Sequence, residues 1–380
     1  MKAFSQSPPQ PERAALVGVI LDGCEIWEAE DSLEELALLA DTAGASVVGR
    51  FTQMRAKPDP ATFIGRGKVQ DIAASNGQFD LVIFDDDLSP AQANALERMI
   101  GKRVIDRSGL ILDIFARRAR TREARTQVEL AQLQYLLPRL TGRWRHLERQ
   151  AGGIGLRGPG ETQLETDRRL VNTRIAKLKN ELKRIERQRS TQRRRRRDLF
   201  KIAIVGYTNA GKSTLLNALT DAQVFVEDRL FATLDATVRS MKGRDTEQIL
   251  LIDTVGFIRK LPHHLVASFK STLEETVIAD LLLHIVDLSH PHYPDQMQQV
   301  AKTLEEMGLK DRPVQVVFNK LDKVEYPAEI ERAKAEHPDA EFISALRGIG
   351  IDTLKERLRI TKQKWLMEMR VQNKQADAGL

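Results

Sequence analysis

The segment that most constrains the fold is Gly206–Ser213, which reads Gly-Tyr-Thr-Asn-Ala-Gly-Lys-Ser. A buried strand is predicted directly before it at Phe200–Val205, and a helix directly after it at Thr214–Leu219. In this context the spacing G-x-x-x-x-G-K-S is typical of a loop whose backbone N–H groups surround a phosphate chain. The pattern predicts an α/β domain with a mainly parallel sheet.

The residue types in this loop match the chemistry of a bound nucleotide. Lys212 is expected to reach the β- and γ-phosphate oxygens, and Ser213 to offer its hydroxyl to Mg²⁺, the expected cofactor. The expected phosphate-binding residues are Gly206, Tyr207, Thr208, Asn209, Ala210, Gly211, Lys212 and Ser213.

A second short segment follows the predicted strand Ile249–Ile252. Its first residue, Asp253, can hold Mg²⁺ through a water molecule, and the N–H of its last residue, Gly256, can sense the γ-phosphate. The segment consists of Asp253, Thr254, Val255 and Gly256.

Two further segments predict that the base is guanine. Asp322 can accept hydrogen bonds from N1–H and the exocyclic amine of guanine, whereas adenine would leave this carboxylate unpaired. Asn319 is expected to meet the opposite edge of the base, and backbone N–H groups near Ser344 to bind O6. The two segments are Asn319, Lys320, Leu321 and Asp322, and then Ser344, Ala345 and Leu346. The substrate is therefore GTP, with GDP as product, although some ATP binding stays open.

A switch loop is expected between the first two segments, because triphosphate orders such a loop and hydrolysis releases it. Both Thr233 and Thr237 could coordinate Mg²⁺ there, and spacing does not decide between them. The loop consists of Phe231, Ala232, Thr233, Leu234, Asp235, Ala236 and Thr237.

The residue after Gly256 is Phe257, where many GTPases carry a glutamine that orients the attacking water. Because a phenyl ring cannot hydrogen-bond to water, we expect slow intrinsic turnover that a partner accelerates. His263 and His264 lie nearby in the sequence, and we interpret them as surface residues rather than catalytic ones.

The charge is distributed very unevenly along the chain. Residues 1–101 carry a net charge of −8, residues 102–201 one of +17, and residues 202–380 one of −3. A nucleic-acid backbone is the partner that such a basic segment favours. The alternative is a solvated helix face that binds nothing.

The basic segment contains two leucine-rich seams with a coiled-coil period, on either side of a glycine-rich loop at 151–161. The seams predict an antiparallel helical hairpin with this loop at its tip, and Pro138 is expected to break the first seam. A hinge loop is the alternative for the tip. The flanking arginines that could bind phosphates are Arg143, Arg145, Arg149, Arg157, Arg168 and Arg169.

The first hundred residues alternate predicted strands and helices, which indicates a small α/β domain. One helix is expected over Ser32–Ala43, with Ser32 as its N-cap and Glu35 closing a capping box. Gly65–Lys68 opens another helix; it has the composition of a phosphate loop without the full spacing, and we interpret it as a plain loop.

Composition excludes several classes of protein. The single cysteine, Cys24, excludes a disulfide framework and suits a reducing cytosol, and aromatics at 5% argue against base-stacking RNA modules. No apolar run approaches the ~18 residues of a membrane span, so no membrane anchor is expected. These features predict a cytoplasmic protein.

These motifs together resemble HflX-type GTPases, a ribosome-associated family in the class of translation-factor-like GTPases. The residues that carry the resemblance are Ile105–Phe115, Gly152–Glu165, Gly206–Ser213, Phe231–Asp235 and Asp253–Ile258. The resemblance implies binding to the large ribosomal subunit and its rRNA, and GTP-dependent dissociation or rescue of stalled ribosomes, notably after heat stress. It also favours Thr233 over Thr237, which gives Lys212, Thr233 and Gly256 as catalytic residues and Ser213 and Thr233 as metal ligands.

The expected organisation has four parts: an α/β domain at 1–115, the hairpin at 116–198, a GTPase domain at 199–362 and a polar tail at 363–380. Some family members carry a further C-terminal domain, whose functions cannot be transferred to this chain. We expect a monomer. The alternative function is a GTP-regulated RNA-binding or ribosome-assembly module that does not split subunits.

Overall fold

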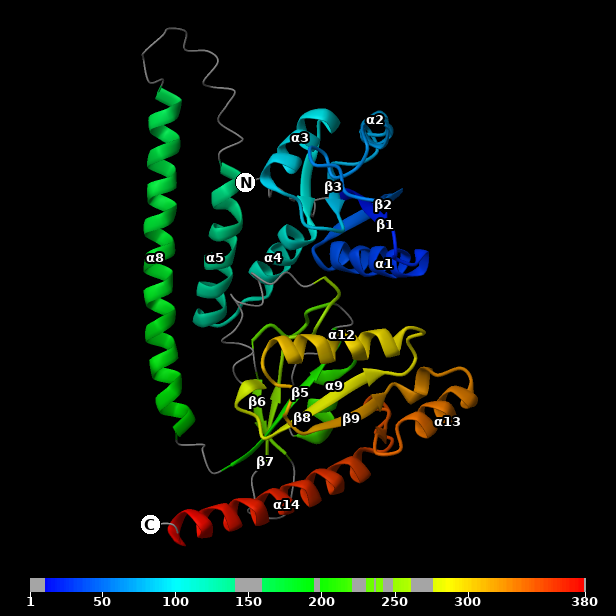
Figure 1. Cartoon of the computed structure of the whole chain (residues 1–380), viewed down its shortest axis with the longest axis vertical. Helices are drawn as coiled ribbons and strands as arrows, with labels where there is room; N and C mark the ends of the chain where they lie inside the picture. Colours follow the sequence, from blue (N-terminus) through cyan, green and yellow to red (C-terminus); the bar gives the residue numbers. More distant parts are fainter. Residues whose placement is uncertain are drawn as a thin grey trace, which may run out of the picture. The chain divides into compact units, whose positions relative to one another are not determined.

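A computed structural model gives the fold of the chain (Figure 1). The structure describes residues 11–140, 159–194, 199–220, 230–235, 237–241, 249–260 and 276–378. The chain divides into two compact units, Met1–Glu186 with Lys260–Phe269 and Arg187–Arg259 with Lys270–Leu380. The α/β region, the first arm of the hairpin and its second arm up to Glu186 therefore fall in one unit.

The first unit contains a fully parallel four-stranded sheet in the order β2-β1-β3-β4. Residues Ala15 and Val17 of β1 face the core against α2 and α3, while Gly18 lies against Leu33 of α1 on the other face. Its elements are β1 (Glu12–Leu21), α1 (Ile26–Thr42), β2 (Ala45–Arg55), α2 (Arg66–Ala74), β3 (Leu81–Phe84), α3 (Pro90–Ile100), β4 (Arg103–Asp106) and α4 (Arg107–Arg118).

The predicted capping role of Ser32 is wrong. Helix α1 begins six residues earlier, with Glu25 as its N-cap, so Ser32 and Glu35 lie inside the helix. Both side chains are buried beside Arg107. Arg107 forms an ion pair with Glu35 and donates to the Ser32 backbone oxygen at 2.9 Å. A tertiary contact, rather than a helix terminus, uses these polar groups.

Arg107 is the centre of a buried polar cluster at the carboxyl edge of this sheet. Its side chain is only 1% exposed and forms a second ion pair, with Asp85. Burial alone would raise the pKa of Asp85, but Arg107 and Lys260 of the same unit lower it to about 2. Beside it, Asp106 accepts from Tyr135 Oη at 2.7 Å and pairs with Arg139.

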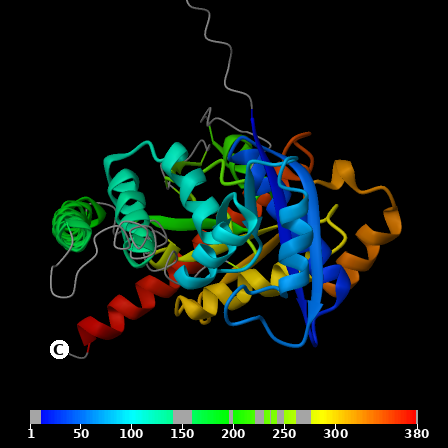
Figure 2. The ribbon, with the colours of Figure 1, turned by 90° about the horizontal axis from the view of Figure 1, so that it is seen from above.

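The helical hairpin is formed by α5 (Arg122–Leu136) and α8 (Pro159–Arg194), which lie side by side in Figures 1 and 2. The apolar seams meet as predicted, with Leu130 of α5 against Ile175 and Leu178 of α8. The ion pairs Glu129–Arg174 and Arg122–Glu181 show the antiparallel direction, because the α8 partner moves back as the α5 residue moves forward.

Pro138 ends α5 as predicted, since it lies in the 3₁₀ turn η1 (Leu137–Arg139) that follows the helix. The glycine-rich tip lies outside the described residues up to position 158, as do Arg143, Arg145, Arg149 and Arg157. The backbone of α8 already begins at Pro159, within the predicted loop.

The second unit contains a six-stranded sheet in the order β10-β9-β8-β5-β7-β6, parallel except for the pair β6–β7. Helices α9 and α14 cover one face, and α12 and α13 cover the other. Its elements are β5 (Phe200–Gly206), α9 (Lys212–Leu219), β6 (Thr237–Ser240), β7 (Ile249–Asp253), β8 (Leu281–Asp287), α12 (Tyr293–Glu306), β9 (Val314–Asn319), η2 (Leu321–Lys323), α13 (Pro327–Glu336), β10 (Glu341–Phe342) and α14 (Ile351–Ala378). The α/β fold class is thus confirmed.

The predicted polar tail at 363–380 needs correction. Helix α14 runs from Ile351 to Ala378 without a break at position 362. Trp365 packs against Phe200 of β5, with ring centroids 5.2 Å apart, so this aromatic side chain extends the core of the second unit.

Candidate nucleotide-binding site

The Gly206–Ser213 loop connects β5 to α9 at the carboxyl edge of the second sheet. Gly211 is the N-cap of α9 and has a φ of +91°. A Cβ at this position would lie 2.3 Å from Nδ2 of Asn319. Both the backbone conformation and this close approach therefore require glycine.

Lys212 is buried beneath the loop, where its Nζ donates to the backbone oxygens of Gly206 at 3.1 Å and Tyr207 at 2.7 Å. Burial lowers the pKa of Lys212 to about 8, although the nearby Asp253 carboxylate opposes this shift. A bound phosphate would supply the negative charge that two neutral carbonyls cannot, so the position of Lys212 suits a polyphosphate chain.

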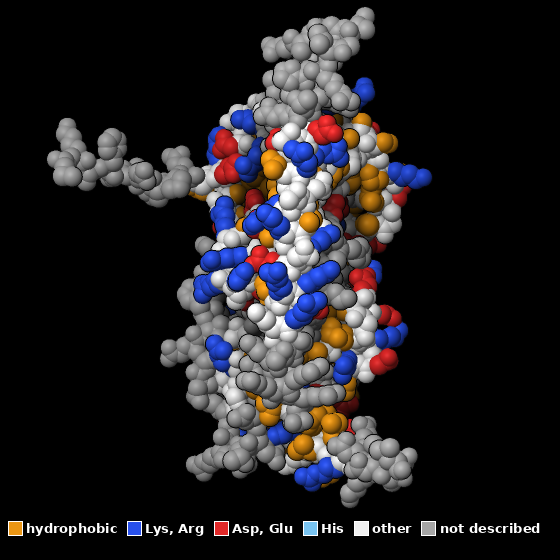
Figure 3. Space-filling model, turned by 90° about the vertical axis from the view of Figure 1, so that its left-hand side faces the viewer, with side chains coloured by type: hydrophobic (Ala, Val, Ile, Leu, Met, Phe, Trp, Pro, Cys, Tyr) orange, Lys and Arg blue, Asp and Glu red, His pale blue; other side chains and the backbone are white. Residues whose placement is uncertain are grey.

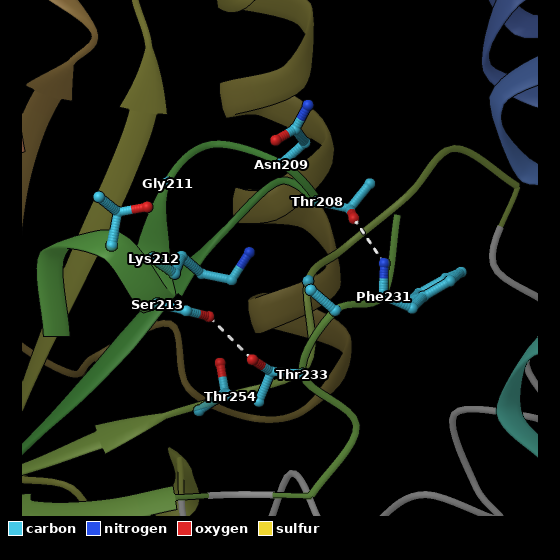
Figure 4. A pocket seen from close by; sticks show the side chains of 11 residues that line it. Thr208, Asn209, Gly211, Lys212, Ser213, Phe231, Thr233 and Thr254 are labelled. Atoms are coloured by element: carbon cyan, nitrogen blue, oxygen red, sulfur yellow. Dashed lines mark hydrogen bonds between the residues drawn. The ribbon is translucent and has the colours of Figure 1, made fainter. Parts of the chain in front are cut away.

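Three oxygen-bearing side chains meet beside the loop, and Figure 4 shows two of them, Ser213 and Thr233. Ser213 Oγ lies 2.8 Å from Thr233 Oγ1 and 2.8 Å from Asp253 Oδ2, and Thr233 Oγ1 lies 3.0 Å from the same carboxylate oxygen. The other carboxylate oxygen, Oδ1 of Asp253, is buried without a hydrogen-bond partner among the described residues. Burial raises the pKa of Asp253, against the effect of Lys212 and the two hydroxyls.

This arrangement fits Mg²⁺. The ion prefers oxygen ligands and completes its shell with phosphate oxygens and water. A divalent cation would also stabilise the ionised Asp253, whose second oxygen has no partner. Ser213 and Thr233 are the residues that would hold it directly, and Asp253 would act through water.

The structure separates the two threonines of the switch loop. Thr233 contacts Ser213 and Asp253, whereas Thr237 lies on β6 and its hydroxyl donates to the backbone oxygen of Asp235 at 3.4 Å. Phe231 is buried, and its N–H donates to Thr208 Oγ1 at 3.1 Å, which ties this loop to the phosphate loop. Ala236 lies outside the described residues.

Gly256 also lies against the phosphate loop. A Cβ here would lie 2.7 Å from Thr208 Cα and 2.8 Å from Lys212 Nζ, so a side chain at this position would collide with the loop. Phe257 follows, only 2% exposed, with its N–H donating to Gly206 O at 3.1 Å and its oxygen accepting from Thr208 N–H at 2.7 Å. Its ring belongs to the core and offers no group to a water molecule.

The predicted base-binding segments meet at the same edge. Asn319 donates to Ala210 O at 2.9 Å and accepts from Ala345 N–H at 3.0 Å, so it joins the phosphate loop to the Ser344 segment. Ser344 Oγ is hydrogen-bonded to Asp322. All four segments are therefore brought together by the tertiary structure.

Sequence reasoning missed Asp287. It ends β8 and pairs with Lys320 Nζ at 2.7 Å, with both side chains largely buried. This pair holds the side chain of Lys320, which belongs to the base-binding segment and has a φ of +66°. Its place at a strand's carboxyl end was the signal available in the sequence. His263 and His264 lie outside the described residues.

A phosphate loop, an oxygen site that fits Mg²⁺ and the two predicted base-binding segments, together on a mainly parallel sheet, are typical of a P-loop GTPase. Three family descriptions match the chain in order: "GTP-binding GTPase N-terminal" at residues 30–116, "GTP-binding GTPase Middle Region" at 118–196, and "50S ribosome-binding GTPase" at 201–320.

Curated relatives give the same result. The chain is 52% identical over 314 residues to GTPase HflX of Flavobacterium psychrophilum, covering 82% of this chain and 76% of that protein. It is 48% identical over 334 residues to GTPase HflX of Escherichia coli, covering 86% and 78%. The chain belongs to the HflX family of ribosome-binding GTPases, and its reaction is the hydrolysis of GTP.

Among solved structures, the chain is similar to the complex of SsGBP with GDP. The TM-score is 0.50 at 26% identity, with 93% of this chain and 99% of that chain covered. Within the described part of the chain, no helix combines the length and the apolar character needed to cross a membrane.

Proposed function

We propose that this GTPase binds the large ribosomal subunit through its basic hairpin and uses GTP binding and hydrolysis to separate or rescue stalled ribosomes. The observation that carries the proposal is the segregation of charge on α8, in the same chain as a guanine-nucleotide site. Ribosomal RNA is the polyanion that such a surface fits.

The two sides of α8 have opposite tasks. Its apolar seam, with Ile175 and Leu178 buried, packs against α5. One of its five acidic residues, Glu181, forms the ion pair with Arg122 of α5. The cations on the opposite face are exposed and form no ion pair among the described residues; they are Arg169, Lys177, Lys183 and Arg184.

Figure 3 shows Lys and Arg side chains gathered along this face. With a rise of ~1.5 Å per residue, the stretch from Arg169 to Arg184 is about 22 Å long, which spans several phosphates of an RNA strand. The solvated-face alternative does not explain why these four cations, all exposed on one helix, have no ion-pair partner among the described residues.

Nucleotide state would act through the switch loop. In the proposed mechanism Lys212 neutralises developing phosphate charge and the Gly256 N–H contacts the γ-phosphate, while Ser213 and Thr233 would hold Mg²⁺. When bound, Mg²⁺ neutralises the charge of the phosphate oxygens. Since Phe257 cannot orient water, the ribosome supplies or orders the missing group and accelerates hydrolysis.

Sedimentation of intact ribosomes with the protein tests the splitting step. With a non-hydrolysable GTP analogue we expect free subunits, and with GDP we expect intact ribosomes. If the analogue yields bound but undivided ribosomes, the chain is instead a GTP-regulated RNA-binding or assembly module.

A matched pair of variants tests the surface. Lys177→Gln with Arg184→Gln removes two charges from α8, and Arg98→Gln with Lys102→Gln removes two from the α/β region. We expect only the α8 pair to weaken binding to large subunits, by about tenfold at ~0.1 M salt. Equal binding of both pairs, or equal binding in every nucleotide state, contradicts the proposal.

A further inference from the structure

Half of the basic residues of the first hundred lie in one short stretch, although this region is acidic as a whole. Residues 1–101 contain eight Lys and Arg side chains, and four of them fall between positions 55 and 68, where Asp59 is the only acid. The four residues, which we call the 55–68 basic patch, are Arg55, Lys57, Arg66 and Lys68. They lie where β2 ends and α2 begins (Figure 1).

The contacts show that these two segments touch. The Arg55 guanidinium lies against Gly65, since a Cβ on Gly65 would be only 2.7 Å from Arg55 Nη1. Arg55 Nε donates to the backbone oxygen of Lys57 at 3.1 Å, and Gln53 Oε1 accepts from Gly65 N–H at 2.8 Å. The glycine is thus needed to place Arg55 beside the start of α2.

The charges of the patch are not balanced locally. Asp59 accepts at one carboxylate oxygen from the N–H groups of Ala61 and Thr62, at 2.8 and 3.0 Å, and Arg55 has a smaller part in lowering its pKa, so this one carboxylate faces four cations. Lys68 has only a distant partner, Asp71, at 3.9 Å. Lys57 and Arg66 are exposed and have no ion-pair partner among the described residues.

Two of the other basic residues of the same region are paired. Arg13 pairs with Asp80 at 3.0 Å, and Arg50 with Glu34 at 2.7 Å. The four cations of the patch repel one another, and an external polyanion would relieve this repulsion. Gly67 adds no side chain there, and the space around it is open.

We propose that the 55–68 basic patch is a second RNA-binding surface, which contacts the phosphate backbone of ribosomal RNA separately from α8. The proposal rests on the proposed function for the identity of the RNA. It also gives a role to the Gly65–Lys68 turn, which the nucleotide site does not use.

The test compares two variants that each remove two positive charges from the same region. One carries Lys57→Gln and Arg66→Gln; the control carries Arg98→Gln and Lys102→Gln. Binding of full-length protein to purified large subunits and to protein-free rRNA is measured between 50 and 300 mM KCl, values chosen so that counterion release is resolved as a slope of about 0.7–0.9 per phosphate contact.

We expect the patch variant to lower the slope of log K against log salt by about 1.5 and the affinity at ~0.1 M salt by about tenfold, with the control unchanged. Circular dichroism and the melting temperature confirm that both variants fold. Equal salt slopes for the two variants on both targets would refute the proposal. It would also be refuted if the patch variant lost affinity for anionic vesicles but not for RNA.

The outcomes separate the two proposals. If α8 variants lose affinity and the patch variant does not, the proposed function stands and the patch is rejected. If the wild-type protein binds rRNA without any dependence on nucleotide, while the patch variant still shows the reduced slope, the proposed coupling fails and the patch stands.

Discussion

The two parallel sheets of this protein carry polar residues at the same place, the carboxyl edge, and use them in different ways. In the first sheet Arg107, Asp85 and Glu35 satisfy one another in a buried cluster. At the edge of the second sheet, Asp253 Oδ1 has no hydrogen-bond partner among the described residues, and Lys212 donates to neutral carbonyls.

This difference teaches how a binding edge differs from a structural one. Buried polar groups are normally satisfied, so a group that is not satisfied indicates a missing ligand. The first edge gains nothing from a phosphate or a cation, because its charges are already compensated. At the second edge, a cation would give Asp253 a partner and a phosphate would give Lys212 a counter-charge. Substitutions at the edge of either sheet test this difference.

The largest expected effect is on the first sheet. Arg107→Met removes the ion pair of the buried Glu35 and one of the two ion pairs of Asp85, whose other partner is Lys260. We expect a loss of about 3–5 kcal/mol in the free energy of unfolding of the first unit. Urea unfolding followed through Trp27 of α1 measures it. The control, Arg13→Met, breaks an exposed pair and should leave the midpoint unchanged. Equal midpoints for both variants would show that the cluster is not structural.

Next in size is Lys212→Ala on the second sheet. We expect GTP turnover to fall by about 10²–10³-fold, because the cation that meets the phosphates is lost. The stability of the nucleotide-free protein should not fall, since a buried ammonium is removed. Fluorescent-nucleotide titration and thermal melting measure both, with the exposed Lys334→Ala as control. A variant that melts earlier but still binds GTP contradicts this assignment.

Asp322→Asn should change the choice of base. The amide offers a donor where the carboxylate accepted, so we expect guanine affinity to drop by about 10²-fold and a xanthine nucleotide to gain. Competition among GTP, xanthosine triphosphate and ATP for a fluorescent nucleotide measures the preference. Retained selectivity for GTP would remove Asp322 from the base site.

The smallest effect concerns His284 of β8. Burial, with a smaller effect of Lys212, lowers the pKa of His284 to about 4. The unfolded chain therefore binds a proton that the folded protein does not between about pH 6.5 and 4, and stability falls as the pH is lowered through this range, by up to about 3 kcal/mol. Urea unfolding at pH 7.5 and 4.5, followed through Trp365, tests this. His284→Leu should flatten the dependence, and an unchanged slope would refute it.

The nucleotide segments could be read from the sequence because their function depends on backbone conformation and spacing. Gly211 needs its positive φ, and Lys212 and Ser213 follow at fixed distances along the chain. Each segment also follows a short buried strand, so the edge on which it lies could be predicted. The α5–α8 seams were predictable for a similar reason, since helical periodicity fixes one face.

Side chains whose partners are far apart in the sequence could not be predicted. Ser32 and Glu35 have the pattern of a capping box, but Arg107, more than 70 residues away, uses both. Asp287 gave no motif, and its role depends on Lys320. Trp365 lies in a segment whose polar composition predicts a tail. Its contact with Phe200 nevertheless makes it part of the core.

The sequence alone determined the class of reaction, the base and the basic character of the hairpin, because these depend on residue types at short spacing. Only the tertiary structure decided that Thr233 rather than Thr237 meets Ser213. It also decided that the polar groups at the first edge pair with one another, whereas at the second edge Asp253 Oδ1 has no partner among the described residues. The physical reason is that hydrogen-bond satisfaction is a property of the assembled neighbours, which no local pattern records.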